Sequence, residues 1–187
     1  PGNNDEKNKG KTKNFGLSFS SIRAHWLSNL AYSINEGYYI DNTKDFNPGW
    51  VSGDPYLQLP DMKVNIVEGL LGYSSNKKFS LKSITSQTER QLKSAGSFIP
   101  ILGARVYYID NLGRTSGQKS NNVEVILGAG YHYTFVLKKQ FYASLGVTPG
   151  FGYISTKLTT RGQLGSPDDI VTSSDAPIIR LEGRGGL

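Results

Sequence analysis

The sequence predicts an all-β fold, an antiparallel transmembrane β-barrel of the outer-membrane type, of which this chain is expected to be an interior fragment. The first observation is the alternation in residues 123–137, where one face of a strand is apolar: Val123, Val125, Leu127, Ala129, Tyr131, Tyr133, Phe135 and Leu137. A period of two is typical of a strand with unlike faces. Strands of globular proteins average ~5–6 residues, and a tilted strand that crosses a bilayer needs ~9–11. The alternating segment is longer than either of these lengths.

The second observation is a composition that suits a barrel better than a globular core. Only 37% of the 187 residues are hydrophobic, and the apolar runs are far too short for a transmembrane helix. In a barrel only alternate residues contact lipid. The 11 Tyr and 8 Phe suit interfacial girdles, and the 22 Gly suit turns and crowded interiors.

Charge and cysteine content exclude several classes. The net charge is +6, but the basic residues form no helix or stripe with stacking aromatics, so we expect no nucleic-acid partner. The absence of Cys excludes a disulfide scaffold and Cys-built metal sites. Polar residues 1–13 precede the first strand and residues 178–187 stop inside one, so we expect a longer protein with a signal peptide.

The first elements are two strands and a long loop. Residues 14–22 alternate apolar side chains with Gly and Ser, and a turn at 22–25 leads to a strand in 26–40. Residues 41–61 contain Asn-Pro-Gly, Ser-Gly-Asp-Pro and Leu-Pro-Asp, which are turn and loop sequences.

A third strand follows in residues 62–74. Glu68-Gly69 disturbs its phase and predicts a β-bulge. A tight turn is expected at 75–78, and residues 79–86 predict a weaker strand. No helical period of useful length occurs in the sequence. The remaining predicted elements are strands at 98–109, 123–137 and 141–153, a last strand from 178, polar loops at 110–121 and 158–177, and a turn at 138–140.

Loop lengths give an independent test, because outer-membrane barrels alternate short periplasmic turns with longer outer loops. The predicted connections alternate in this way only if residues 79–109 cross the membrane an odd number of times. One extended run of that length would reach ~100 Å, far more than a bilayer. We therefore expect residues 87–97 to leave the wall and fold into the lumen.

Residues 89–97 read Glu-Arg-Gln-Leu-Lys-Ser-Ala-Gly-Ser. Together with Gly-Lys-Thr-Lys at 10–13, Glu-Gly-Tyr-Tyr-Ile at 36–40 and Leu-Gly-Val-Thr-Pro-Gly-Phe-Gly at 145–152, this string resembles a family of Bacteroidota outer-membrane proteins, domain of unknown function 4421. The resemblance extends to about residue 155. It implies an outer-membrane barrel with a signal peptide and brings no established activity, so no catalytic residues are carried over.

Six side chains are candidates for a ligand site or a structural network in the lumen: Glu89, Arg90, Lys93, Arg105, Glu124 and His132. The structural alternative is a plug in which opposite charges satisfy one another, because unpaired charges are costly in a shielded interior. A zinc site needs three or four ligands and His25 is the only other His, so we expect His132 to be a hydrogen-bonded lumen residue and no metal to bind.

Four aromatic residues surround the first long loop. Tyr38 and Tyr39 are expected in the interfacial girdle. Trp50 and Tyr56 are left open between structural packing and stacking on sugars or peptides.

We expect no enzyme and no cofactor, because no Gly-x-Ser-x-Gly string occurs and His132 has no evident nucleophile partner. The expected function is a plugged scaffold or accessory subunit of an envelope complex in the bacterial outer membrane, with the lipid bilayer and other outer-membrane or periplasmic proteins as partners. Gly146, Gly150 and Gly152 favour a filled interior. The alternatives are a small-solute pore or transport channel and a soluble lipocalin-like binding protein.

Overall fold

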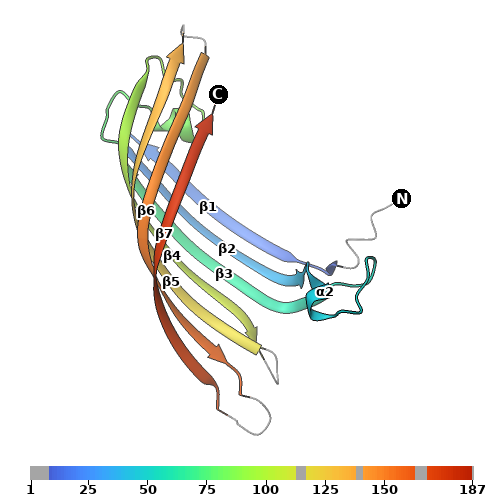
Figure 1. Cartoon of the computed structure of the whole chain (residues 1–187). Helices are drawn as coiled ribbons and strands as arrows, with labels where there is room; N and C mark the ends of the chain where they lie inside the picture. Colours follow the sequence, from blue (N-terminus) through green and yellow to red (C-terminus); the bar gives the residue numbers. More distant parts are fainter. Residues whose placement is uncertain (1–8, 113–116, 138–140, 163–167, 187) are drawn as a thin grey trace.

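The computed structural model describes residues 9–112, 117–137, 141–162 and 168–186, which form one antiparallel sheet. Each of the seven strands pairs with its neighbours in sequence order. The strands are β1 (Lys13–Arg23), β2 (Trp26–Ile40), β3 (Leu57–Tyr73), β4 (Ala95–Leu112), β5 (Gly117–Leu137), β6 (Phe141–Thr160) and β7 (Ile170–Gly186). Figure 1 shows a strongly bent sheet. The prediction of an antiparallel all-β fold is confirmed.

Two short helices with described bounds accompany the sheet. α2 (Thr43–Phe46) lies in the connection between β2 and β3, and α3 (Leu81–Thr85) lies between β3 and β4, within the curve of the sheet (Figure 1). In the part of the chain that the structure describes, no helix is long and apolar enough to cross a membrane. We call the face that carries α3 the inner face and the opposite face the outer face.

Cross-strand register aligns apolar residues into rows on the outer face. One row runs through Ser21, Ser28, Leu71, Leu102, Leu127, Phe151 and Ile179. The alternation predicted in residues 123–137 is present in β5, where successive side chains lie on opposite faces. Leu127 is 64% exposed on the outer face, and Ile126 is 3% exposed on the inner face. The apolar face of this long strand is therefore the uncovered one.

The buried apolar cluster lies on the inner face, beneath α3. Phe79 and Leu81 pack with Ile99 of β4, and partly buried residues surround them: Ile22, Leu27, Ile84, Ala95 and Ile101. The segment before β4 thus supplies the apolar layer that covers this end of the inner face.

The predicted strand at 79–86 is wrong, because these residues contain α3. Ser80 caps the helix, since its side chain accepts a hydrogen bond from the Ser83 backbone N–H at 3.2 Å. Capping satisfies an N–H that would otherwise lack a partner. A short apolar run is compatible with either structure, and here contact with the sheet decides between them.

The predicted bulge at Glu68-Gly69 is also wrong. Both residues pair without interruption with β2 and with β4. Glu68 carries a charge on the inner face, so it breaks the apolar pattern but not the backbone register. The irregularity between β2 and β3 falls instead at Gly37, whose φ of +83° is favourable only for glycine.

The predicted loops are longer than the real connections. The loops at 110–121 and 158–177 largely become strand, because β4 reaches Leu112, β5 starts at Gly117 and β7 starts at Ile170. Likewise β3 starts at Leu57, inside the predicted loop at 41–61. Strand pairs such as Asp110 with Lys119 are polar, and backbone hydrogen bonds do not require apolar side chains.

The predicted alternation of short and long connections does not hold. Residues 74–94 join β3 to β4 at the same end of the sheet as the short turn between β1 and β2. Residues 79–109 contribute a single strand, β4, which is an odd number as the prediction required. Within the predicted inward segment 87–97, residues 87–94 lie off the sheet. The predicted turn at 138–140 and residues 1–8 lie outside the described residues.

Candidate functional site

Three charged residues line up across the inner face because the strand register makes them direct neighbours. Glu68 of β3 pairs with Arg105 of β4, and Arg105 pairs with Glu124 of β5. Nη2 of Arg105 lies 3.1 Å from Oε2 of Glu68, and its Nη1 lies 4.0 Å from Oε2 of Glu124. The predicted candidates Arg105 and Glu124 are thus brought together.

A fourth strand completes this arrangement. Nη2 of Arg180, on β7, donates a hydrogen bond of 2.8 Å to Oε1 of Glu124, on β5. Arg180 pairs with Gly150 of β6, so this ion pair joins two strands that are separated by the intervening strand. Nη1 of Arg180 also lies 3.9 Å from Oε1 of Glu182. We call Glu68, Arg105, Glu124, Arg180 and Glu182 the inner-face charge network.

Burial in this network is uneven. Glu124 is 8% exposed, and the two arginine side chains that flank it are 38% and 37% exposed. A buried carboxylate is costly unless it is paired, and two guanidinium groups supply the compensation here. The arrangement can hold four strands in register, and it borders a cavity of 410 Å³.

His132 lies nearer the end of β5 and is held by two neighbours. Its Nε2 lies 3.1 Å from Oγ1 of Thr148 on β6. Its ring also covers Gly146, where an added Cβ would lie 1.9 Å from Nδ1. Only glycine fits at position 146 without moving the ring. The structure places His132 as a hydrogen-bonded residue that is separate from the charge network.

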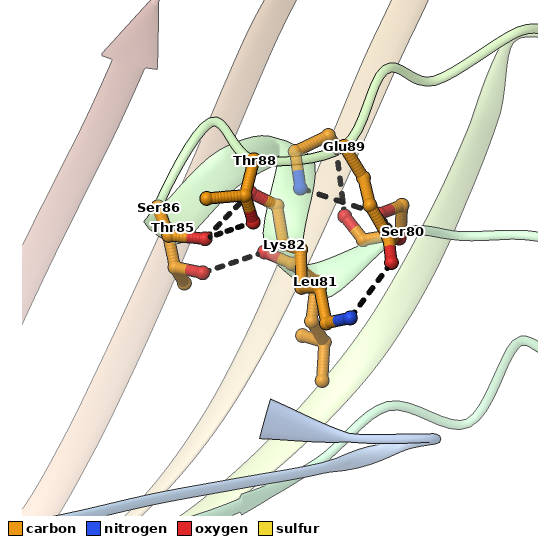
Figure 2. A network of polar contacts seen from close by, with 8 residues as sticks. Ser80, Leu81, Lys82, Thr85, Ser86, Thr88 and Glu89 are labelled. Carbon is orange, nitrogen blue, oxygen red and sulfur yellow. Dashed lines mark hydrogen bonds and ion pairs between the residues drawn. The ribbon is translucent and has the colours of Figure 1, made fainter. Parts of the chain in front are cut away.

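Glu89 belongs to a second cluster around α3. Figure 2 shows Glu89 beside Lys82 and Ser80, and its oxygens accept hydrogen bonds of 2.8 and 2.9 Å from these side chains. The hydrogen bond from Lys82, and then that from Ser80, holds the pKa of Glu89 below its ordinary value. Arg90 and Lys93 are exposed. These three predicted candidates therefore lie apart from Arg105 and Glu124.

Gln91 anchors the segment that follows α3. The side chain is 6% exposed, and its Nε2 donates to the backbone oxygens of Lys78 and Lys93 at 2.7 and 2.9 Å. Its Oε1 accepts from the Ser80 backbone N–H at 2.8 Å. One amide thus ties the residues before α3 to those after it, and a charge-based search of the sequence does not find this residue.

The aromatic residues of the first long loop pack on one another. Tyr56 lies between Tyr39 and Trp50, with ring centroids 5.3 and 5.1 Å apart. Trp50 donates its indole N–H to the Pro55 oxygen at 3.0 Å. Tyr38 pairs with Leu59 across β2 and β3. Trp50, Tyr56 and Tyr39 thus form a small aromatic cluster at the loop end of the sheet.

Three members of the inner-face charge network were missed from the sequence: Glu68, Arg180 and Glu182. Glu68 was interpreted as a bulge signal, and the other two lie in a chain end with little apolar alternation. The pair Gly150 and Gly152 on β6 gives no signal for these charges, because the space over both glycines is occupied by the side chain of Ile126. No group of three or more His, Asp or Glu residues within the described ranges is placed to hold a metal ion.

This geometry defines a protein of one bent antiparallel sheet, with an apolar outer face and an inner face that carries paired charges and a capped helix. The chain belongs to the family described as Domain of unknown function (DUF4421), which matches residues 1–187. The family prediction is thereby confirmed. A comparison with curated proteins and a comparison with solved structures each found no match.

Proposed function

We propose that this chain forms the wall of an outer-membrane β-barrel with an occupied interior, and that it acts as a scaffold or accessory subunit of an envelope complex. Its partners in this proposal are the lipid bilayer and other outer-membrane or periplasmic proteins. We assign it no catalytic activity. The single observation that carries the proposal is the outer face, where large apolar side chains stay exposed on every strand.

The apolar surface is continuous rather than scattered. The next row on this face contains Leu30, Val125 and Tyr153, and these three side chains, like Leu127 and Phe151, are more than a third exposed. Soluble monomers rarely expose contiguous apolar patches larger than a few hundred Å². No described segment covers this face. Lipid is the solvent that such a surface suits, and this disfavours the soluble lipocalin-like alternative.

The strands are also long enough to cross a bilayer. β5 has 21 residues and β6 has 20, which exceeds the ~9–11 that a tilted crossing needs. Unpaired backbone groups cannot face lipid, so a closed wall requires partners for the edge strands β1 and β7. In the proposed barrel these edges pair with further strands.

The inner face favours a scaffold over a wide channel. The segment around α3 packs onto it, and the ring of His132 fills the space over Gly146. A small-solute pore is the second candidate, because the charge network borders a cavity of 410 Å³ rather than a solid core. Bilayer conductance of the purified full-length protein separates the two. The scaffold predicts no stable open channel, and removing residues 80–93 should create one.

The two tryptophans test the membrane placement. Trp26 is 56% exposed and faces outward beside Tyr73, whereas Trp50 lies in the loop cluster. The difference in emission between the unaltered protein and the Trp26→Phe variant reports on Trp26, and the difference from the Trp50→Phe variant reports on Trp50. In vesicles with lipids brominated along the acyl chain, we expect strong quenching of Trp26 and weak quenching of Trp50. Equal quenching of both, or quenching of Trp26 only by aqueous iodide, contradicts the proposal.

A further inference from the structure

Arg184 lies on the inner face of β7 in the same cross-strand row as His132. The row runs from Ser97 through His132 and Gly146 to Arg184. Gly146 has no side chain, and the imidazole of His132 occupies the space over it, on the side of the row from which Arg184 is reached across β6. On the inner face α3 lies beside this row, and its residues Ser83 and Ile84 line the same cavity as His132 and Arg184.

Arg184 differs from the other two arginines of the inner face. Arg105 and Arg180 each make ion pairs with glutamates. Among the described residues, no carboxylate forms an ion pair with Arg184. Arg184 is exposed to solvent, and a guanidinium without a carboxylate partner is a place where an anion gains charge-assisted hydrogen bonds.

A cavity of 60 Å³ lies at this position, between α3, β5, β6 and β7. Its polar lining consists of hydrogen-bond donors and includes no carboxylate from the part of the chain that the structure describes: Ser83, Gln87, His132, Tyr142, Ser144 and Arg184. Glu182 borders the two larger cavities nearby but not this one. The charge and the donors therefore select against cations and for an anion.

The size of the cavity selects among anions. One water molecule needs roughly 10–15 Å³ of cavity volume, so a cavity of 60 Å³ holds about four to six, which is close to the size of one tetrahedral oxyanion. The cavity shares Arg184 with neighbouring cavities of 100 and 410 Å³, which supply a route along the inner face.

We propose that this cavity is a binding site for a phosphate group, with Arg184 as the charged ligand and the side chains of Ser83, Gln87 and Ser144 as further donors. The site faces the inner side of the sheet, so a soluble phosphate or phosphomonoester reaches it and a bilayer lipid does not. The proposal does not depend on the membrane placement of the outer face.

Equilibrium dialysis of inorganic phosphate against the full-length protein, folded in a detergent without phosphate, tests the proposal. We expect saturable binding at one site per chain. Arg184→Gln should weaken it at least tenfold, and Arg184→Lys should retain part of it. Arg90→Gln is the matched control, because Arg90 is exposed near the same end and does not line the cavity. It should bind as the unaltered protein does.

Three results would overturn the proposal. The first is an absence of saturable phosphate binding by the unaltered protein. The second is unchanged binding by Arg184→Gln when its gel mobility before and after heating shows that it is folded. The third is binding of a phospholipid dispersed in micelles with displacement of phosphate, which would assign the site to lipid instead.

Discussion

Replacement of Leu127 by arginine separates a lipid-facing outer face from a water-facing one. Leu127 is 64% exposed on the outer face and is the middle residue of β5. If water covers this face, an exposed Leu→Arg change costs within about 0.5 kcal/mol, because the arginine stem keeps the contacts and the head stays solvated. If hydrocarbon covers it, the cost is about 2–4 kcal/mol. An increase of at least ~30-fold in the unfolding constant follows from the lower figure.

Urea unfolding of the full-length protein in lipid vesicles measures this difference as a shift of the midpoint at constant slope. The matched control is Ser155→Arg, which also changes an outer-face residue. Ser155 lies four residues along β6 from Phe151, the cross-strand partner of Leu127, and therefore ~13 Å nearer the strand end. Its cost should fall to about 0–1 kcal/mol. Equal costs at the two positions would refute the lipid-facing assignment.

Two further predictions concern the charged clusters. Glu124→Gln should lower the free energy of unfolding in urea by about 2 kcal/mol, because two guanidinium groups lose the nearly buried carboxylate that they share. Glu182→Gln changes an exposed carboxylate and should lower it by less than about 0.5 kcal/mol. A larger loss for Glu182→Gln than for Glu124→Gln would contradict the assigned pairing. The pKa of Glu89 is lowered in the folded protein, so its contribution to stability is fully present above its ordinary pKa and is lost as the pH falls through the pKa of the folded state. A carbon-detected NMR titration should show that Lys82→Met raises the pKa of Glu89. An unchanged pKa would count against the contact with Lys82.

Part of the site could be predicted from the sequence. Arg105 and Glu124 were placed on the inner face by alternation alone, and the register makes them neighbours. Arg180 could not be paired with Glu124 in this way, because the two residues lie on β7 and β5 and are separated by the whole of β6. Glu89 was grouped with Arg105 on charge, yet Lys82 and Ser80 are nearer partners once α3 forms.

The sequence by itself determined the strand class and the two unlike faces, since alternation is a local property that any extended segment expresses. Tertiary structure decided where the strands end, that residues 81–85 are helical, and which charges meet. Polar strand ends look like loops until a neighbouring strand supplies their hydrogen bonds. A charge finds its partner through sheet register and curvature, which no short window of residues contains.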